Sequence, residues 1–514
     1  MANAALIKRE GWKQAIEFAK ESEKLSKSVG DRHSQAAALT TLASAHLTGG
    51  SSDEALKAAS SALDIVRQGG DVNAISEALE TMMNVKPEKS LEWAEEELNL
   101  AGKAENPKRE VAALKRVAGV HFANDLFEEA IAKAKQAREL QKKLGDKAGE
   151  AITCSVIADY CLSQKKHQEA LEASRAAQAL LKECGNVIGQ AQALQQEFRV
   201  HCGMEDVEAA RKAAWDQRLL FQEAKYKEQE AATLLEIADF EAHVGGAAEA
   251  LKPVELARAL YRELEDKEGE ADACRAIANI HLADQSAAEA LKAAEDAFKL
   301  SKDAGDAKGK ASALQTKTSI LVSQEKYKEA AILATEARQV LQESGHAWTE
   351  ANAVQMVANV YLAACQKAAE ADKDPEASTV KEAQSTAEEA VRLFQGMRDT
   401  EGQAAALLVA SSAMYYAQDG DRALQLGREA LDLYEKFGNS QGMANAWLAM
   451  ARGAFLAGTN FDGALEAAEE AKRLAEVLGD DQIQTNALSL IDIISDSMRK
   501  VAPAQAGQRG QAQR

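Results

Sequence analysis

The sequence predicts an all-α fold, a right-handed superhelical solenoid of about 11–12 stacked antiparallel helix pairs. Three observations lead to this prediction: a composition poor in aromatics, a turn signal at a fixed spacing, and helical spacing of apolar residues between the turns. Of the 514 residues, 46% are hydrophobic but only 5% are aromatic, so alanine and leucine must supply most of the apolar share. Such a composition favours long helices that pack closely through small side chains.

The turn signal is a glycine followed by Asp or Asn. Glycine takes the left-handed conformation that ends one helix, and the next side chain can then cap the following helix. Copies at 105, 145, 185, 225, 265, 305 and 345 give a step of 40 residues each time. Full copies are Gly30-Asp31, Gly70-Asp71, Gly145-Asp146, Gly185-Asn186, Gly305-Asp306, Gly438-Asn439 and Gly479-Asp480, and degenerate copies are Glu105-Asn106, Lys225-Tyr226, Glu265-Asp266, Gly345-His346 and Arg398-Asp399.

Each repeat contains two helices, which we call helix A and helix B. In the repeat after Gly145, small residues at Ala158, Ala170 and Ala177 fall on helical spacing, and a short polar turn at 164–168 separates the two halves. Alanines where helices cross allow close approach. A lone helical hairpin cannot bury its apolar face, so the hairpins must stack.

The repeats resemble the tetratricopeptide repeat family. That resemblance is carried by Val357-Ala358-Asn359-Val360-Tyr361, by Ile277-Ala278-Asn279-Ile280-His281 and by Tyr327-Lys328-Glu329-Ala330. The 40-residue period exceeds the commonest period of about 34. It is similar to the longer-helix branch found in kinesin light chains, in the adaptor that links G-protein subunits to the mitotic spindle machinery, and in bacterial maltose-type regulators.

We expect residues 1–501 to form one continuous solenoid, because five prolines are too few for linker-joined domains. Two irregularities interrupt it. The repeat at 70–105 is short, and Asn84 to Pro87 should break or shorten its helices. An insertion near 365–380 predicts an exposed loop centred on 371–378, with helix B resuming near Val380.

The C-terminal part should hold two further features. Residues 482–501 form an unpaired helix A, which predicts a terminal capping helix. The tail at 502–514 is rich in Gln, Gly and Ala, and we expect it to be disordered.

Composition and motifs argue against catalysis and against nucleic-acid binding. A net charge of −20 leaves no basic excess to neutralise phosphates. No phosphate loop, nucleophile elbow or other catalytic spacing is present. Six scattered cysteines form no CxxC pair, and neither a signal peptide nor a membrane span can be read from the chain. We therefore expect a cytoplasmic, non-enzymatic protein with no cofactor.

One helix A position carries only metal-ligand residue types in six repeats: His46, His121, Cys161, His201, Glu241 and His281. Equivalent positions in neighbouring repeats should lie about 10 Å apart, too far for shared coordination at about 2 Å. The position is also the family's aromatic slot. We therefore predict packing side chains and no metal site.

The resemblance implies that helix A lines a concave face that grips extended peptides. Asn279 and Asn359 match an asparagine that in several relatives hydrogen-bonds the peptide backbone, and an amide offers both a donor and an acceptor. A row of mostly apolar residues lies three positions further on, and polar residues lie a turn earlier. The candidate peptide-binding residues are Asp159, Arg199, Asp239, Arg275, Asn279, Leu282, Gln315, Gln355, Asn359, Leu362 and Arg452.

Two interpretations of these rows remain open. They form a peptide groove, or the polar row is a solvated surface and the apolar row is inter-helix packing. The first makes the protein an adaptor or scaffold that binds an extended segment of another protein. The second makes it a structural subunit of a large assembly, with contacts through helix B, the edges or the 371–378 loop. Asp159 and Asp239 at two rungs of the asparagine row favour a basic or polar ligand.

Overall fold

The computed structural model describes residues 11–70, 72–103, 106–345, 347–458 and 460–511. Over these ranges the chain forms 24 α-helices and one short 3-10 helix, with no strand, so the predicted all-α class is confirmed. Three residues of the predicted turn signal, Asp71, Glu105 and His346, lie outside the described residues, as do residues 1–10.

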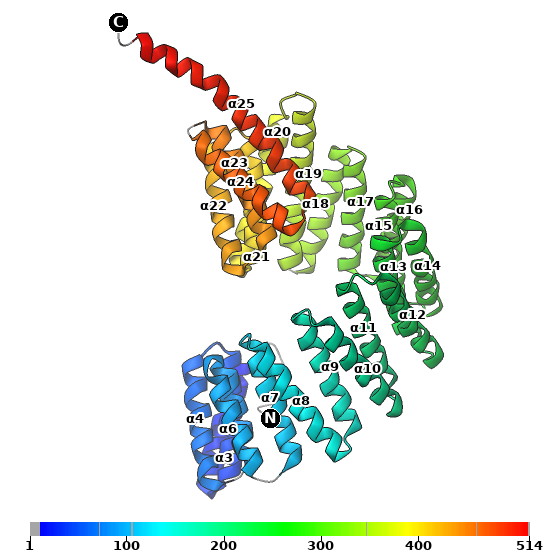
Figure 1. Cartoon of the computed structure of the whole chain (residues 1–514), viewed down its shortest axis with the longest axis vertical. Helices are drawn as coiled ribbons and strands as arrows, with labels where there is room; N and C mark the ends of the chain where they lie inside the picture. Colours follow the sequence, from blue (N-terminus) through cyan, green and yellow to red (C-terminus); the bar gives the residue numbers. More distant parts are fainter. Residues whose placement is uncertain (1–10, 71, 104–105, 346, 459, 512–514) are drawn as a thin grey trace. The chain divides into compact units, whose positions relative to one another are not determined.

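Contacts divide the chain into two compact units, Met1–Thr233 and Leu234–Arg514, and each is described by itself. The division falls within α13 (Lys227–Val244). The helices of the first unit, coloured blue to green in Figure 1, are α2 (Trp12–Val29), α3 (Arg32–Thr48), α4 (Ser52–Gly69), α5 (Val72–Val85), η1 (Pro87–Lys89), α6 (Ser90–Lys103), α7 (Pro107–Ala123), α8 (Phe127–Leu144), α9 (Lys147–Ser163), α10 (His167–Glu183), α11 (Val187–Gly203) and α12 (Val207–Ala224).

The second unit continues the same pattern. Its helices, coloured green to red in Figure 1, are α14 (Ala247–Glu263), α15 (Lys267–Ala283), α16 (Ala287–Ala304), α17 (Ala307–Ser323), α18 (Tyr327–Ser344), α19 (Ala347–Glu370), α20 (Ala377–Met397), α21 (Thr400–Tyr416), α22 (Gly420–Phe437), α23 (Ser440–Ala457), α24 (Phe461–Leu478) and α25 (Asp481–Gln511). Whether the two units form the single domain expected for 1–501 stays a prediction.

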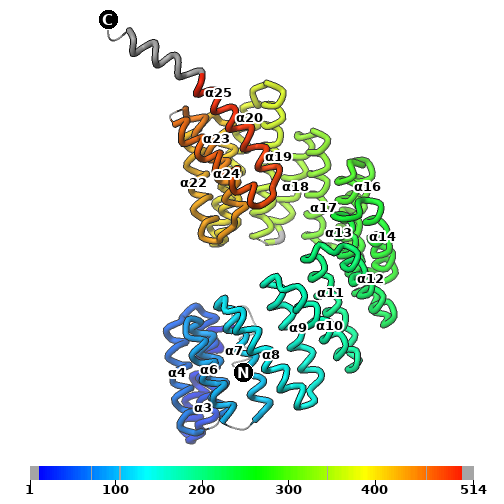
Figure 2. Tube along the Cα trace, viewed as in Figure 1, coloured from blue at the N-terminus to red at the C-terminus, as the bar shows by residue number. Residues whose placement is uncertain are grey.

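Within each unit, consecutive helices pack against each other in antiparallel pairs, as the trace in Figure 2 shows. Odd-numbered helices from α3 onward are the predicted helix A, and even-numbered helices from α4 onward are helix B. Contacts between second neighbours join A helices: α3 with α5, α9 with α11, α15 with α17, α17 with α19, α19 with α21, α21 with α23, and α23 with α25. Where these contacts are made, consecutive A helices therefore lie closer together than consecutive B helices.

Left-handed residues end the helices at both kinds of turn. Between 125 and 345 they recur every 20 residues, shifted by one at Gly246. The degenerate copies adopt this conformation without glycine, with φ of 61° at Lys225, 56° at Glu265 and 58° at Arg398. The full set in this range is Asp125, Gly145, Lys165, Gly185, Glu205, Lys225, Gly246, Glu265, Gln285, Gly305, Glu325 and Gly345.

The capping role predicted for Asp and Asn is confirmed. The Asp266 carboxylate accepts the backbone N–H of Gly269 at 3.0 Å, and the Asn439 side chain accepts that of Gly442 at 2.9 Å. Such caps satisfy donors that the first turn of a helix leaves free.

The glycine inside this first turn also lets the preceding helix B approach. A Cβ placed on Gly269 would lie 2.3 Å from Cδ1 of Tyr261, and one on Gly402 would lie 2.3 Å from Cδ1 of Phe394. A side chain from the last turn of helix B thus packs directly against the first turn of the next helix A. We call this contact the B–A seat.

The irregular segments differ from the prediction in one respect. The 70–105 region holds two helices of 14 residues, α5 and α6, joined through η1. The insertion, expected as a loop, is mostly helical: α19 has 24 residues and α20 has 21, against 17 and 18 in the preceding repeat. The connecting loop is 371–376, within the predicted 371–378, and helix B resumes at Ala377, three residues before the predicted Val380. Alanine-rich sequence at both ends of the insertion favours helix over loop.

The C-terminal helix α25 begins at Asp481, one residue from the predicted start, and extends to Gln511, past the predicted end at Val501. The disorder expected for 502–514 stays a prediction.

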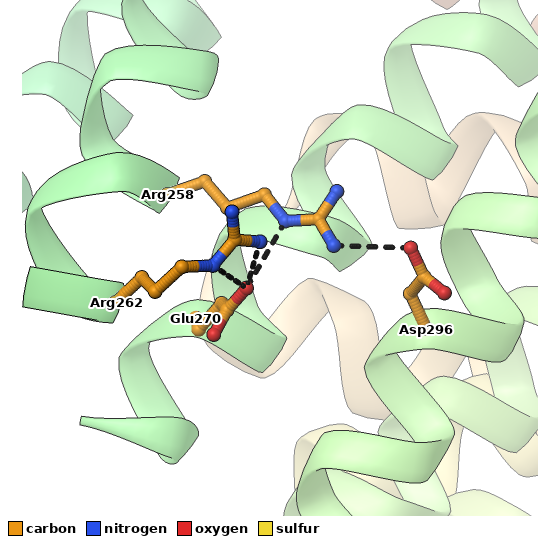
Figure 3. Close-up of polar contacts among 4 residues, drawn as sticks. All are labelled: Arg258, Arg262, Glu270 and Asp296. Carbon is orange, nitrogen blue, oxygen red and sulfur yellow. Dashed lines mark hydrogen bonds and ion pairs between the residues drawn. The ribbon is translucent and has the colours of Figure 1, made fainter. Parts of the chain in front are cut away.

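Arg–Glu pairs join helix B of one repeat to helix A of the next. In the pair shown in Figure 3, Glu270 of α15 accepts from Arg258 Nε at 3.3 Å and from Arg262 Nη2 at 2.5 Å, and Arg258 also reaches Asp296 of α16 at 3.0 Å. Equivalent pairs are Arg138–Glu150 at 3.4 Å and Arg218–Glu230 at 2.7 Å. One repeat later the same positions carry Phe298 and Lys310, whose ammonium lies 5.9 Å from the ring centroid.

Candidate functional site

The predicted polar and apolar rows lie on the A helices. The polar residues Asp159, Arg199, Asp239, Asn279 and Asn359 are all exposed. The apolar row is half-buried throughout: Leu47, Phe122, Leu162, Leu282, Val322, Leu362, Tyr415 and Phe455. Partial exposure fits both open interpretations, so the neighbours of each residue must decide between them.

In the first unit, residues of the predicted rows interact with side chains on the neighbouring A helix. Arg199 Nη1 of α11 lies 3.3 Å from the Asp159 carboxylate of α9, so these two residues, at equivalent positions of neighbouring repeats, form an exposed ion pair. Phe122 stacks on Tyr160 of the next A helix, with ring centroids 4.4 Å apart. These contacts favour the interpretation of surface and packing in this part of the chain.

The middle part of the candidate set is dispersed. Arg275 Nη2 donates to Asp272 of the same helix at 2.6 Å. Asp239 accepts at its backbone carbonyl from His243. Leu282, Gln315 and Gln355 are half-buried on α15, α17 and α19, and neither they nor Asn279 line a described cavity.

Three candidates do come together. Asn359 and Leu362 of α19 and Arg452 of α23 line one cavity of about 230 Å³, which we call the A-helix cavity. All of its lining residues belong to three consecutive A helices, α19, α21 and α23. The remaining ones are Ala363, Gln366, Ser411, Ser412, Tyr415, Tyr416 and Ala449.

The polar groups of the A-helix cavity divide into engaged and open ones. The Ser411 hydroxyl donates to the Ala423 carbonyl at 2.8 Å, and Gln366 donates to Glu370 at 3.1 Å, so both have structural partners. In the described part of the chain, Asn359 and Arg452 have no side-chain hydrogen bond or ion pair. An open amide and an open guanidinium can therefore serve a ligand.

Arg452 dominates the electrostatics of this cavity. Among the lining residues it is the one with a charged side chain. Burial raises the pKa of the Tyr416 hydroxyl, and the positive charge of Arg452 opposes that rise. The cavity thus combines a cation, a neutral phenol, an amide and apolar walls. This set suits a carboxylate on an otherwise uncharged segment.

Sequence reasoning missed a larger cavity, which we call the insertion cavity. It measures about 540 Å³ and lies between the 325–329 turn, α19 and the 371–376 loop. Tyr327, Tyr361 and Pro375 supply apolar wall, and exposed ion pairs link its sides, Lys367 with Glu325 at 2.8 Å and Lys328 with Glu376 at 3.9 Å. The length of the insertion between 345 and 398 was the feature of the sequence that could have indicated this cavity. That the insertion would lengthen α19 and α20 was not predicted from the sequence.

Within the described ranges, no three His, Cys, Asp or Glu side chains lie close enough to bind a metal ion. Burial lowers the pKa of His46 and raises the pKa of Cys154 and Cys161, which suits the packing roles expected for them. All six cysteines are free thiols. No helix in the described ranges is long and apolar enough to cross a membrane.

Comparison with known proteins identifies the repeat. The tetratricopeptide repeat family matches residues 109–183, which cover α7 to α10. Residues 109–183 therefore match two consecutive helix pairs of the tetratricopeptide repeat type. Such repeats are typically non-catalytic and generally mediate binding of proteins and peptides. No curated protein sequence matches the chain significantly.

Solved structures with similar architecture have low sequence identity to this chain. A STAND signal transduction ATPase with a tetratricopeptide repeat sensor, from Pyrococcus horikoshii, has 12% identity and a TM-score of 0.44 over 80% of this chain and 57% of that one. The present chain thus spans just over half of that ATPase. Yeast Tom70 has 15% identity and a TM-score of 0.42 over 92% of this chain and 99% of that one. A Rap protein complexed with competence and sporulation factor has 10% identity and a TM-score of 0.38 over 69% and 99%.

Proposed function

We propose that the protein is a non-enzymatic adaptor that binds an extended segment of a partner protein on its A helices, centred on the A-helix cavity. The observation that supports this most is the convergence of Asn359, Leu362 and Arg452 from α19 and α23 into one cavity. That the repeats belong to the branch that includes kinesin light chains, the spindle adaptor and maltose-type regulators remains a prediction from the repeat length.

The partner segment should present a carboxylate to this cavity. The sequence favoured a basic or polar ligand because of Asp159 and Asp239, but Asp159 is paired with Arg199 at 3.3 Å. In the cavity itself Arg452 carries the only charge among the lining residues, and it has no ion-pair partner in the described chain. A carboxylate bound by Arg452, with Asn359 bonded to the peptide backbone, would satisfy both open groups.

Affinity purification with wild type and variants tests the proposal. The Asn359→Ala and Arg452→Ala variants should each fail to retain the partner. The control variant Arg428→Ala should retain it, because Arg428 is exposed on α22, which is a helix B. A charge-assisted hydrogen bond contributes about 1.5–3 kcal/mol, so Arg452→Ala should weaken the purified complex about 10- to 100-fold. Unchanged binding by both variants, with unchanged helical circular dichroism, would exclude the A-helix cavity.

Asn279→Ala tests how far the contact surface extends, because Asn279 lies on α15 outside the cavity. A loss of binding in Asn279→Ala as well would place the partner segment along several A helices. A loss confined to Asn359→Ala and Arg452→Ala would restrict it to α19–α23.

The insertion cavity favours a second candidate, a structural subunit that contacts other proteins through its edges. Its lining includes the 373–376 part of the predicted contact loop. In that case, cross-links in a purified assembly should concentrate on B helices and on 371–376, and the A-helix variants should assemble normally.

A further inference from the structure

The side chain that fills the B–A seat varies among the repeats. The residue in the last turn of helix B rests on a glycine in the first turn of the next helix A. The pairs are Gln141 on Gly149, Leu181 on Gly189, Tyr261 on Gly269, Phe394 on Gly402 and Tyr434 on Gly442. The repeat at α16–α17 departs from this pattern, because Ser301 lies over Gly309 and both residues are small.

A cavity adjoins Ser301, at the position where three of these five repeats place an aromatic ring. It measures about 350 Å³, and its lining includes Ser301, Gly305, Ala307, Lys310 and Val340 from α16, α17, α18 and the turn between α16 and α17. We call it the Ser301 cavity. It is separate from the A-helix cavity, which shares none of these residues.

The Ser301 hydroxyl has no hydrogen-bond partner within the described residues, although only 1% of the residue is exposed. A buried polar group without a partner destabilises the folded state, because it has given up its hydrogen bonds to water. By contrast Ser174 and Ser26, which are also buried on helix B or its equivalent, donate to backbone carbonyls at 2.7 Å. Ser301 therefore offers an unused hydrogen-bonding group to the cavity.

The charged groups of the cavity are partly engaged. Asp306 accepts from the backbone N–H of Gly309 at 2.9 Å, and Glu343 accepts from Gln339 at 3.2 Å. Lys310 lies with its ammonium 5.9 Å from the Phe298 ring centroid and has no carboxylate partner in the described chain. Lys302 also lines the cavity and has no ion-pair partner among the described residues, so both ammonium groups are further open donors.

We propose that the Ser301 cavity binds one phenol ring supplied from outside the chain. Two other repeats carry a tyrosine at the position of Ser301, and the rings of Tyr261 and Tyr434 lie against the glycine of the next helix A. Val340 and Ala307 supply apolar contact for the ring. A phenol is favoured over an unsubstituted ring because its hydroxyl can bond to Ser301 or accept from Lys310.

p-Cresol, the side-chain analogue of tyrosine, tests this site by saturation-transfer NMR on the full chain. We expect wild type to bind it with a dissociation constant on the order of 1 mM. Ser301→Tyr should fill the cavity and abolish binding. Ser301→Ala should weaken binding about fivefold, the effect of one hydrogen bond, whereas Ser319→Ala on the exposed face of α17 should leave it unchanged.

Thermal stability gives an independent readout. Ser301→Tyr should raise the melting temperature, and Ser301→Leu, which reproduces the contact that Leu181 makes with Gly189, is the substitute if the tyrosine variant fails to fold. Ser301→Ala should also raise it, because that change removes an unpartnered hydroxyl. Equal p-cresol binding by wild type and by a folded Ser301→Tyr or Ser301→Leu variant, or no binding to wild type, would overturn the proposal. N-acetyltyrosine amide then distinguishes the two sources: binding of both probes indicates a partner's tyrosine, and binding of p-cresol alone indicates a free phenol.

Discussion

Glu270 forms ion pairs with both Arg258 and Arg262. We predict that the more buried pair, with Arg258, has the larger coupling energy although its atoms lie further apart. The Glu270 carboxylate lies closer to Arg262, at 2.5 Å, than to Arg258, at 3.3 Å. However, the Arg262 side chain is 64% exposed, whereas Arg258 is 27% exposed and Glu270 only 10%. If solvent screening decides, the longer contact contributes more to stability.

The expected magnitudes follow from the dielectric around each pair. Two unit charges about 4 Å apart interact by about 1 kcal/mol in water and about 4 kcal/mol at an effective dielectric of about 20. Desolvation and side-chain ordering offset part of this. We expect a coupling of about 2 kcal/mol for Arg258 with Glu270, and about 0.5 kcal/mol for Arg262 with Glu270.

Two double-mutant cycles measure these couplings, one with Arg258→Ala and Glu270→Ala, and one with Arg262→Ala and Glu270→Ala. Urea unfolding followed by circular dichroism gives the free energies, provided that the denaturant slope is the same in all variants. Asp296→Ala serves as a control, because it removes the second contact of Arg258 but leaves Glu270 in place. A coupling for Arg262 equal to or larger than that for Arg258 would refute the reasoning from burial.

Three further predictions test the turn chemistry and one buried thiol. Gly269→Ala should destabilise the chain by about 2 kcal/mol, because the new Cβ would lie 2.3 Å from the Tyr261 ring. A Cβ on Gly396 would have nothing within 4 Å, so Gly396→Ala should stabilise the chain by about 0.5–1 kcal/mol. Thermal melts in which both variants shift in the same direction would contradict this. Asp266→Ala should cost about 1 kcal/mol by removing the cap on the Gly269 N–H, and no loss in urea unfolding would show that the cap is dispensable. Burial raises the pKa of the Cys274 thiol from 9.0 to about 11, so the thiol loses its proton more readily in the unfolded chain. The unfolding free energy should therefore fall as the pH rises from about 9 to about 11, and Cys274→Ala should make that fall shallower; an identical pH profile for the variant would count against the shift.

Turn chemistry explains why so much of the fold could be predicted from the sequence. Asp and Asn after a helix-ending residue cap the next helix wherever they occur, so Asp266 and Asp399 mark the repeat even after Glu265 and Arg398. These two residues adopt φ of 56° and 58° without the freedom of glycine. A strained left-handed residue is tolerated there because packed helices on both sides hold it.

Side-chain neighbours set the limit of sequence prediction for the site. The repeat register places Asn279 and Asn359 at equivalent positions, yet of the two it is Asn359 that lines the A-helix cavity. What differs is the neighbouring repeat, where Tyr415 and Tyr416 of α21 and Arg452 of α23 complete the walls. Equally, a serine at position 301 does not stand out in the sequence. It becomes informative only when Tyr261 and Phe394 are seen to occupy the equivalent place on a glycine.

The 20-residue spacing of left-handed residues limits how the chain can change length in evolution. Adding or removing whole repeats keeps every helix in register with its neighbours, so such changes cost little in packing. The extra residues between 345 and 398 do not fit this unit, and they lengthen α19 to 24 residues and α20 to 21. That lengthening carries both helices beyond the neighbouring repeat, and the overhang forms walls of the insertion cavity. In a protein of this kind, a fractional insertion is a route by which a new surface arises without disturbing the older ones.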